Sequence, residues 1–387
     1  MGRMDWRLDG RTDIMTDSLR WAKFNAPLRF KFKHASANRI ASSSIIVEAK
    51  LGQFIGYGEA CPRSYVTSET EESVISFLKT HGEDWIKSIN SIEALRKKIH
   101  TEKELINQNP AAFSALEIAF LDALAQEQKI SIECLLGLRE LNDNLHYSAI
   151  VGDSSPFKTR AQSLIYKLIG FRDFKVKIGA DTERDKKRFQ SLPRNIRLRV
   201  DANNLYNDPD ECADHLKGLK QKIWAIEEPL QVGDADGQTQ LARAMNARII
   251  LDESLINIDQ LSPYQDPSLE WIANVRVSKC GGIIRSIDLA RAAQAQGMGV
   301  ILGAHVGETS LLSRAALTVG QALELPPLAR EGAFGKILVT KDICEPSLRF
   351  GSGGIISIMQ WNFAKKTGLG LSIQPDLIFK GAESLAL

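Results

Sequence analysis

Five short apolar runs, each closed by a charged residue, recur between residues 174 and 279: FKVK (174–177), IRLRVD (196–201), IWAIE (223–227), RIILD (248–252) and VRVSK (275–279). The closing residues, with Glu308 beyond them, follow one another at intervals of 24 to 29 residues. Runs this short and this rich in β-branched residues predict strands and not buried helices. One strand, one helix and two turns take roughly 25 to 30 residues, which is the repeating unit of a (β/α) barrel.

Similar apolar runs continue the repeat on both sides. We expect eight strands, at residues 147–151, 173–178, 196–201, 223–227, 248–252, 272–278, 299–304 and 336–340. Helical patterns lie between them, which implies parallel strands joined by right-handed crossovers. Eight such strands are enough to close a barrel.

The segments that flank the barrel have different patterns. Residues 27–60 predict three strands of an antiparallel meander, and residues 69–127 place apolar residues three and four apart, as helices do. We therefore predict four parts, an extension at 1–16, an α+β capping domain at 17–140, the barrel at 141–343, and a C-terminal segment at 344–387 that returns to the capping domain.

The composition excludes several classes of protein. Of the 387 residues, 44% are hydrophobic and 25% charged, and the net charge is +2, so neither nucleic acid nor an anionic membrane is an expected partner. No apolar run approaches the ~20 residues that span a bilayer, and the first residues lack the apolar core of a secretory signal. The five cysteines are scattered without a CxxC pair, which indicates free thiols in a reducing cytoplasm and no zinc site.

The repeat brings acidic side chains together. In a (β/α) barrel the carboxyl ends of the strands meet around one mouth, so Asp201, Glu227 and Asp252 should converge there. Each acid alone also suits a helix cap or a surface ion pair, but three together would repel one another unless a cation lay between them. Mg²⁺ prefers oxygen ligands of this kind, and we predict a Mg²⁺ site. Asn203 shares the face of Asp201 by strand alternation.

Lysines flank the predicted metal site on both sides. Lys175 and Lys177 lie two residues apart on one strand and point the same way, so each should lower the pKa of the other, although a solvated strand edge is the structural alternative. Lys279 closes the sixth strand and Lys177 the second, which places them opposite each other in a ring of eight. A general base on each face of a bound carboxylate suits proton transfer at the adjacent carbon. A Schiff-base aldolase, and a barrel that has lost activity and only binds ligands, are the competing hypotheses.

Taken in order, these residues resemble the enolase superfamily, specifically its muconate-lactonizing-enzyme subgroup (the mandelate racemase/muconate lactonizing enzyme family). The resemblance covers nearly the whole chain from about residue 18 and rests on GYGEA (56–60), KVK (175–177), DAN (201–203), EEP (227–229), DES (252–254) and SKCGG (278–282). Enolase-superfamily sites use a Lys or His base with Mg²⁺ that stabilises an ene-diolate.

The resemblance implies a modified TIM barrel, (β/α)₇β, with an α+β cap that the C-terminal tail completes. It implies Mg²⁺ on Asp201, Glu227 and Asp252, with Mn²⁺ as a possible substitute. Lys177 and Lys279 would be the acid and base, with Lys175 in support of Lys177. A homo-oligomer is also expected, because association is common among such barrels.

Substrate choice in this subgroup comes from cap loops folded over the barrel mouth, here residues 31–39 and 61–69. The resemblance implies substrate contacts from these loops and from the mouth, namely His34, Arg39, Arg63, Tyr65, Thr67, Asn203, His305 and Glu308. Arg63 would pair with a remote substrate carboxylate, or else be a surface charge. His305 would hydrogen-bond to substrate, or else be a buried histidine at a strand end.

The subgroup contains cycloisomerases, o-succinylbenzoate synthases, N-acylamino-acid racemases and dipeptide epimerases, which share the lysines and the metal site. We favour a racemase or epimerase of an amino-acid derivative or dipeptide, because two opposed lysines are both useful there. Cycloisomerisation, or β-elimination by a lyase, needs only one base. GAHVGET (303–309) lacks the Asp-x-Asp pair by which many dipeptide epimerases hold a substrate ammonium, which counts against a dipeptide with a free amine.

Overall fold

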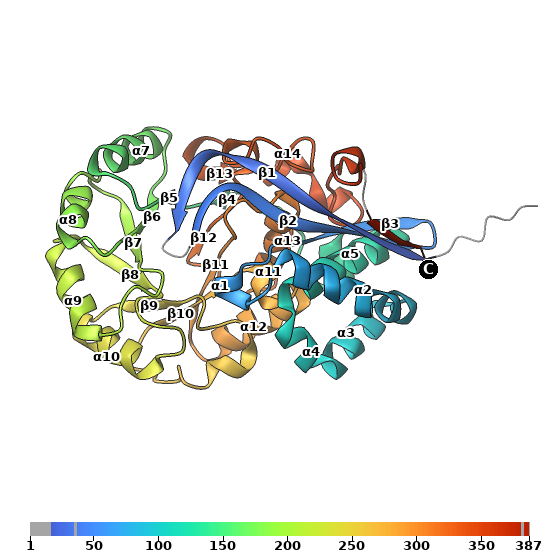
Figure 1. Cartoon of the computed structure of the whole chain (residues 1–387), viewed down its shortest axis with the longest axis horizontal. Helices are drawn as coiled ribbons and strands as arrows, with labels where there is room; N and C mark the ends of the chain where they lie inside the picture. Colours follow the sequence, from blue (N-terminus) through green and yellow to red (C-terminus); the bar gives the residue numbers. More distant parts are fainter. Residues whose placement is uncertain (1–16, 35–36, 381–382, 387) are drawn as a thin grey trace, which may run out of the picture.

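The computed structural model describes residues 17–34, 37–380 and 383–386. It contains a four-stranded antiparallel sheet backed by helices, and an eight-stranded parallel sheet that curls into a barrel (Figure 1). The fold class expected from the sequence is confirmed. The predicted extension at 1–16 lies outside the described residues.

The cap is an antiparallel meander followed by helices, in the order that the sequence predicts. Its elements are β1 (Ser18–His34), β2 (Ala37–Leu51), β3 (Phe54–Ala60), α1 (Ser64–Thr67), α2 (Glu71–Ser88), α3 (Ile92–Thr101), α4 (Lys103–Gln108), α5 (Pro110–Glu127) and α6 (Ile132–Leu135). The helix α5 is buried from Pro110 to Ala125, because it lies between the cap sheet and the barrel. In Figure 1 the cap helices α2 to α5 lie on the side of α11 and α12, away from β6, β7 and β8, while the cap strands β1 and β2 extend across the molecule toward β5.

Two glycines explain how closely β3 packs on α5. A Cβ atom at Gly56 would lie 2.0 Å from the Ala119 carbonyl oxygen, and one at Gly58 would lie 1.8 Å from the Ala115 carbonyl oxygen. No side chain fits at either place, so the backbone of β3 packs directly against the backbone of α5. Between these glycines and the barrel, the buried Glu59 accepts hydrogen bonds from the Thr309 N–H (3.0 Å) and hydroxyl (2.6 Å). The GYGEA segment thus attaches the cap to the barrel.

The barrel strands are all parallel and follow the order β12-β11-β10-β9-β8-β7-β6-β5. They are β5 (Ala149–Val151), β6 (Asp173–Lys177), β7 (Arg197–Asp201), β8 (Ile223–Glu227), β9 (Arg248–Leu251), β10 (Trp271–Val275), β11 (Gly299–Leu302) and β12 (Ala329–Arg330). The helices are α7 (Pro156–Leu168), α8 (Thr182–Gln190), α9 (Pro209–Gly218), α10 (Ala235–Met245), α11 (Val277–Cys280), α12 (Ile283–Ala295) and α13 (Ser310–Gln321). The sheet curls back on itself, since the Ser148 N–H beside β5 donates to the Arg330 carbonyl of β12 at 2.8 Å.

Two strand predictions are wrong. The eighth strand is Ala329–Arg330, and the segment predicted at 336–340 instead begins with a short 3₁₀ helix (Gly335–Ile337). The sixth strand ends at Val275, so Lys279 does not close a strand but lies in the helical turn α11. At the sixth strand the alternating pattern continues past the last residue that pairs in the sheet, whereas the apolar run at 336–340 is separate from the two-residue strand that precedes it.

After the barrel the chain returns to the cap sheet. The remaining elements are β4 (Leu145–His146), β13 (Ile355–Ile356), α14 (Ile358–Trp361) and β14 (Glu383–Ala386), with 3₁₀ helices at Ile258–Leu261, Ser352–Gly354, Phe363–Lys365 and Pro375–Leu377. β14 pairs with β1, and β13 pairs with β4. The division at 17–140, 141–343 and 344–387 remains our proposal, which these pairings support. No helix in the described part of the chain is long and apolar enough to cross a membrane.

Candidate active site

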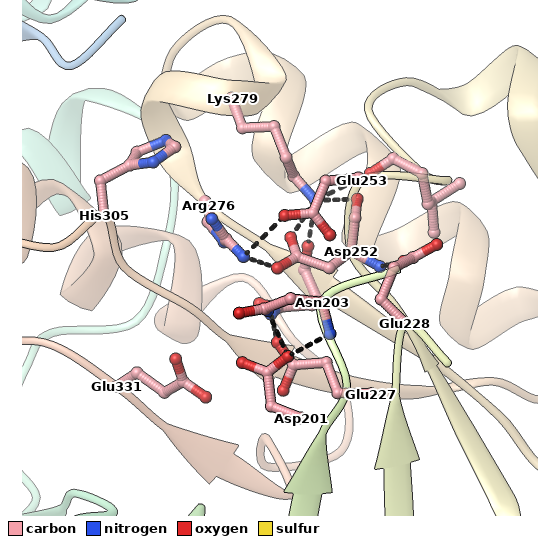
Figure 2. Close-up of polar contacts among 12 residues, drawn as sticks. Asp201, Asn203, Glu227, Glu228, Asp252, Glu253, Arg276, Lys279, His305 and Glu331 are labelled. Atoms are coloured by element: carbon pink, nitrogen blue, oxygen red, sulfur yellow. Dashed lines mark hydrogen bonds and ion pairs between the residues drawn. The ribbon is translucent and has the colours of Figure 1, made fainter. Parts of the chain in front are cut away.

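The three predicted acids lie at the ends of neighbouring strands. Asp201 ends β7, Glu227 ends β8, and Asp252 directly follows β9. Asp201 is the parallel partner of both Lys177 on β6 and Glu227 on β8. All three carboxylates are buried, and Figure 2 shows them in one cluster of charged side chains. The predicted convergence at the barrel mouth is therefore present.

Lys175 is held by three carboxylates, two on strands β7 and β8 and one directly after β12. Its Nζ lies 2.7 Å from Glu227 Oε1, 3.1 Å from Asp201 Oδ2 and 3.1 Å from Glu331 Oε1. Burial alone would lower the pKa of Lys175, but these three acids raise it above its usual value. The expectation that the pKa of Lys175 is lowered is therefore wrong, because the nearby negative charges outweigh both burial and the neighbouring lysine.

Lys177 faces Asp201, one of these carboxylates, from the next inward position of β6. Its Nζ donates to Asn203 Oδ1 at 2.7 Å and lies 3.4 Å from Asp201 Oδ2. Asn203 has a left-handed backbone (φ 48°), and its N–H donates to Asp201 Oδ1 at 3.1 Å. The DAN segment is thus a turn that fixes Asp201 and presents an amide to Lys177.

Lys279 reaches the cluster from the other side and is fully buried. Its Nζ lies 3.0 Å from Asp252 Oδ1 and donates to the carbonyl oxygens of Asp252 (2.7 Å), Asn274 (2.7 Å) and Leu255 (2.9 Å). Burial lowers the pKa of Lys279 to about 8, which brings it toward the range of a general base at neutral pH. Figure 2 shows Lys279 directed toward Asp252.

Several charged residues of the cluster were not predicted as site residues. Arg276, from the turn after β10, forms ion pairs with Asp252 and with Glu253 Oε1 (3.6 Å). Glu331, which follows β12, binds Arg199 Nη2 at 2.6 Å as well as Lys175. Strand alternation could have identified Arg199, which is two residues from Asp201 on β7. Glu331 was missed with the eighth strand.

The neighbouring acid Glu228 has a structural role, as strand alternation suggests for a residue that points away from Glu227. It accepts hydrogen bonds from the Asp252 N–H and from the Ser254 hydroxyl, so it fixes the loop that carries Asp252. Burial raises the pKa of Glu228 to about 7. From strand alternation we expect Glu253, which follows Asp252, to face away from the site or to join the loop; it is buried in the cluster, where burial raises its pKa to about 8.

The donor set of this cluster fits a divalent cation by its chemistry. Its carboxylates outnumber its cations, and within the described residues the buried Glu227 Oε2 and Glu253 Oε2 have no hydrogen-bond partner. Such orphaned oxygens are costly unless a cation binds them. Among the described residues, no three His, Cys, Asp or Glu side chains are grouped closely enough to hold a metal as they stand. The ammonium of Lys175 and the guanidinium of Arg276 instead lie against the oxygens of Asp201 and Asp252.

The predicted substrate-contact residues differ in how near they lie to the cluster. His305 is buried beside the cluster, and its N–H donates to Glu308 Oε2 at 3.0 Å. Burial raises the pKa of Glu308 to about 8. Tyr65 and Thr67 are partly buried in α1, which lies between the cap helices and the barrel strands in Figure 1. The side chains of His34 and Arg39 lie outside the described part of the structure.

Arg63 is neither a surface charge nor open to the mouth. Its guanidinium is buried and donates to the carbonyl oxygens of Pro62 (2.7 Å), Ser43 (3.1 Å) and Val306 (3.1 Å). The bond to Val306 joins the cap to the loop between β11 and α13, and the other two lie within the cap. A substrate carboxylate would have to replace them in order to pair with Arg63.

Comparison with known proteins gives relatives along nearly the whole chain. The L-Lys-D/L-Arg epimerase of Methylococcus capsulatus is 28% identical over 90% of this chain and 96% of its own length. The N-succinyl-L-Arg/Lys racemase of Bacillus cereus is 26% identical over 91% of this chain and 94% of its own length. The crystal structure of a dipeptide epimerase from Methylococcus capsulatus, complexed with Mg and the dipeptide L-Arg-D-Lys, matches with a TM-score of 0.76 and 25% identity over 92% of this chain and 100% of that one.

A family model confirms the resemblance that the site residues predict. The model for enolase C-terminal domain-like proteins matches residues 158–377, a range that contains every charged residue of the cluster. Because that range is more than half of the sequence, the chain belongs to the enolase C-terminal domain-like family.

Proposed function

We propose that this protein is a Mg²⁺-dependent racemase or epimerase that moves the α-proton of an amino-acid derivative or dipeptide with a free carboxylate. The observation that carries the proposal is the approach of two lysines to the acids from opposite sides, Lys177 to Asp201 and Lys279 to Asp252. The L-Lys-D/L-Arg epimerase and the N-succinyl-L-Arg/Lys racemase among the relatives favour a substrate with a basic side chain.

The proposed reaction divides the work between the lysines. One neutral lysine amine takes the α-proton from one face of the substrate, and the electron pair of the C–H bond is left on the carboxylate as an enolate. The opposite lysine, as an ammonium, then donates its proton to the other face of the same carbon. Asn203 orients Lys177, and the carbonyls of Asp252, Asn274 and Leu255 orient Lys279.

Asp201, Glu227 and Asp252 would hold the Mg²⁺ ion, and Mn²⁺ is proposed as a substitute. The bound ion would supply positive charge against the negative charge that develops on the substrate carboxylate. Glu228 would keep the Asp252 loop in place through its hydrogen bonds. The other substrate contacts predicted from the sequence remain proposals, with Asn203, His305 and Glu308 lying nearest the cluster.

Solvent-deuterium uptake tests this function. The protein with Mg²⁺ is incubated in D₂O with N-succinyl amino acids and with dipeptides that have basic or apolar side chains, and the products are read by mass spectrometry and chiral chromatography. We expect gain of one deuteron at the α-carbon together with inversion. Uptake without inversion would contradict racemisation, and no uptake in any pool would contradict the proposal as a whole.

We also propose a homo-oligomer in the cytoplasm, joined through the outer face of α7. The usual burial pattern of an amphipathic helix is reversed in α7, because the polar residues Thr159 and Ser163 are buried while apolar side chains are exposed. The exposed apolar residues are Phe157 (82% exposed), Leu164, Ile165, Leu168 (85%) and Ile169. At roughly 100 Å² per side chain on average, this stripe of five side chains offers about 500 Å² of the ~800 Å² that each partner contributes to a stable dimer. A twofold axis would set the stripe against its own copy.

Light scattering with size-exclusion chromatography tests the proposed interface. The wild type is expected at twice the 42.9 kDa chain mass or more, and Ile165→Glu at the chain mass. Leu377→Glu is the matched control, because Leu377 is equally exposed (56%, against 58% for Ile165) but lies in the C-terminal segment. A monomeric wild type would contradict the proposal.

A further inference from the structure

Lys279 lies in a turn that has little support of its own. The helix α11 has only four residues, and it ends at two glycines in left-handed or extended conformations, Gly281 (φ 86°) and Gly282 (φ 98°). One helical turn is not stable in isolation, because the few hydrogen bonds it makes do not offset the conformational entropy lost. Contacts from elsewhere must therefore fix the backbone that carries Lys279.

The next helix also begins without a cap from its own sequence. Residue Gly282 occupies the cap position of α12 and has no side chain to offer to the first N–H groups. Glu117, on the cap helix α5, takes this role across the junction. Its Oε2 accepts from the Ile283 N–H at 2.9 Å, and its Oε1 accepts from the Ile284 N–H at 2.6 Å. A carboxylate at a helix N-terminus satisfies orphan donors and interacts favourably with the helix dipole.

The fit between Glu117 and the glycine turn is close. Glu117 is completely buried, and a Cβ atom at Gly282 would lie 2.6 Å from its carboxylate carbon. On the other side of Lys279, the Cys61 N–H of the cap donates to Ser278 Oγ at 2.9 Å. Hydrogen bonds from the cap therefore hold the chain at Ser278, immediately before Lys279, and at Ile283 and Ile284, shortly after it.

We propose that Glu117 is a positioning residue for Lys279, so that docking of the cap helix α5 sets the base on one face of the substrate. This inference rests on the proposed function, in which Lys279 and Lys177 serve opposite faces. Lys177 and its contacts Asn203 and Asp201 all belong to the barrel. Loss of Glu117 should therefore impair one face of the reaction and leave the other nearly unchanged.

The experiment measures α-proton exchange in D₂O separately from each epimer of a turned-over substrate. Lys279→Ala first identifies the epimer whose proton Lys279 removes. Glu117→Ala is then expected to slow exchange from that same epimer by roughly 10- to 100-fold, since a misplacement of about 1 Å can cost a catalytic group this much. Exchange from the other epimer should change less than about threefold, and Glu117→Gln, which keeps one acceptor, should recover part of the loss.

Glu69→Ala is the matched control. Glu69 is also buried, and it holds the N-terminus of α5 by bonds to the N–H groups of Ala111 (2.8 Å) and Ala112 (2.9 Å), entirely within the cap. It should slow exchange from the two epimers equally, if at all. Equal loss from both epimers in Glu117→Ala would overturn the inference and would show a merely structural role.

A second measurement does not depend on activity. Lys279 is fully buried and should resist acylation by an amine-reactive ester in the wild type and in Glu69→Ala. In Glu117→Ala the loosened turn should expose it, so that labelling of Lys279 rises severalfold while Lys175 and Lys177 stay protected. Unchanged protection of Lys279 would overturn the inference. An absence of exchange by the wild type would count against the proposed function alone.

Discussion

The two sides of the barrel mouth are built by different means. On the β6–β8 side, Lys175, Lys177 and Asp201 are held by charges that belong to the barrel, including Glu331, which follows β12, and Arg199 on β7. On the β10–β11 side, the loops depend on the cap, because Glu117 and Cys61 hold the turn around Lys279, while Glu59 and Arg63 hold the loop after β11 (Figure 1).

This difference shows how one barrel can keep its chemistry while its cap changes. Among the described residues, the ion pairs that place Lys175 and Lys177 on the barrel-held side all come from the barrel itself. The cap-held side couples the second lysine to the same domain whose loops are expected to choose the substrate. If the cap docks incorrectly, both substrate binding and the proton transfer by Lys279 should be impaired, while the proton transfer by Lys177 persists.

The largest expected effect comes from removing either lysine. Lys177→Ala and Lys279→Ala should each lower racemisation by roughly 10²- to 10⁴-fold, the usual contribution of a general acid or base. Each variant should keep exchange from the epimer that the remaining lysine serves. Proton NMR of the α-hydrogen in D₂O measures both. Lys97→Ala, an exposed lysine of α3, is the control, and equal loss of exchange from both epimers in both variants would break the comparison between the two sides.

The barrel-held side can be tested through Glu331. Glu331→Gln removes a buried charge that pairs with Lys175 and Arg199. Burial acts to raise the pKa of Glu331, but these two cations outweigh it and lower the pKa to about 2. Lys175 keeps Asp201 and Glu227 and Arg199 keeps Asp173, so the loss of this one buried partner should lower the free energy of unfolding by about 3 kcal/mol, the low end of the range for breaking a buried pair. Urea titration measures this, and Mg²⁺ titration by calorimetry should show weaker binding. A selective effect on the Lys279 epimer would contradict the division of the site.

The repeat of strand-end charges predicted most of this site, because strand alternation and a fixed strand–helix period determine where Asp201, Glu227 and Asp252 must lie. Residues that lie in irregular or very short elements were not placed correctly from the sequence. VRVSK has the alternation of a strand although Lys279 sits in a helical turn, and a strand of two residues gives no signal for Glu331. The role of Arg63 comes from bonds to backbone carbonyls far apart in sequence, which no local pattern shows.

The role of Glu117 could not be predicted from the sequence for a related reason. It is one of two acids buried in a long apolar helix, and its partners, Ile283 and Ile284, lie more than 160 residues away. Their N–H groups belong to the backbone, so no complementary side chain marks the pairing. Contacts between domains through backbone groups can be recognised only once the domains are placed together.

The cap-held side can be disturbed without touching a polar group. In Gly58→Ala the new methyl group would meet the Ala115 carbonyl oxygen of α5, and overpacking of this kind costs about 1–3 kcal/mol. Gly152→Ala is the control, because a Cβ atom there meets nothing within 4 Å. Thermal unfolding should show the loss only for Gly58→Ala. In Gly58→Ala, exchange from the epimer that Lys279 serves should also be slower. An equal loss of exchange from both epimers would contradict the proposed difference between the two sides.

The smallest expected effect is a dependence of stability on pH that originates in the cap. Burial raises the pKa of Glu117 to about 7, although the Ile284 and Ile283 N–H groups and Arg96 favour its charged form and Asp288 opposes it. Between its ordinary value of 4.5 and about 7, the folded state holds a proton that the unfolded state has released. Stability must therefore fall as pH rises through this window and level off above it.

Burial raises the pKa of Glu69 in the same way to about 7, so both acids contribute to the slope. Glu117→Gln should flatten part of it, because the amide does not titrate, and Glu69→Gln should flatten another part. Urea midpoints measured from pH 4.5 to 8 give the slopes. If Glu117→Gln also changes the pH dependence of exchange from the Lys279 epimer while Glu69→Gln does not, the charge of Glu117 acts on the base through the turn and not through global stability. An identical response of the two variants would mean that the cap contributes only stability to this side of the mouth.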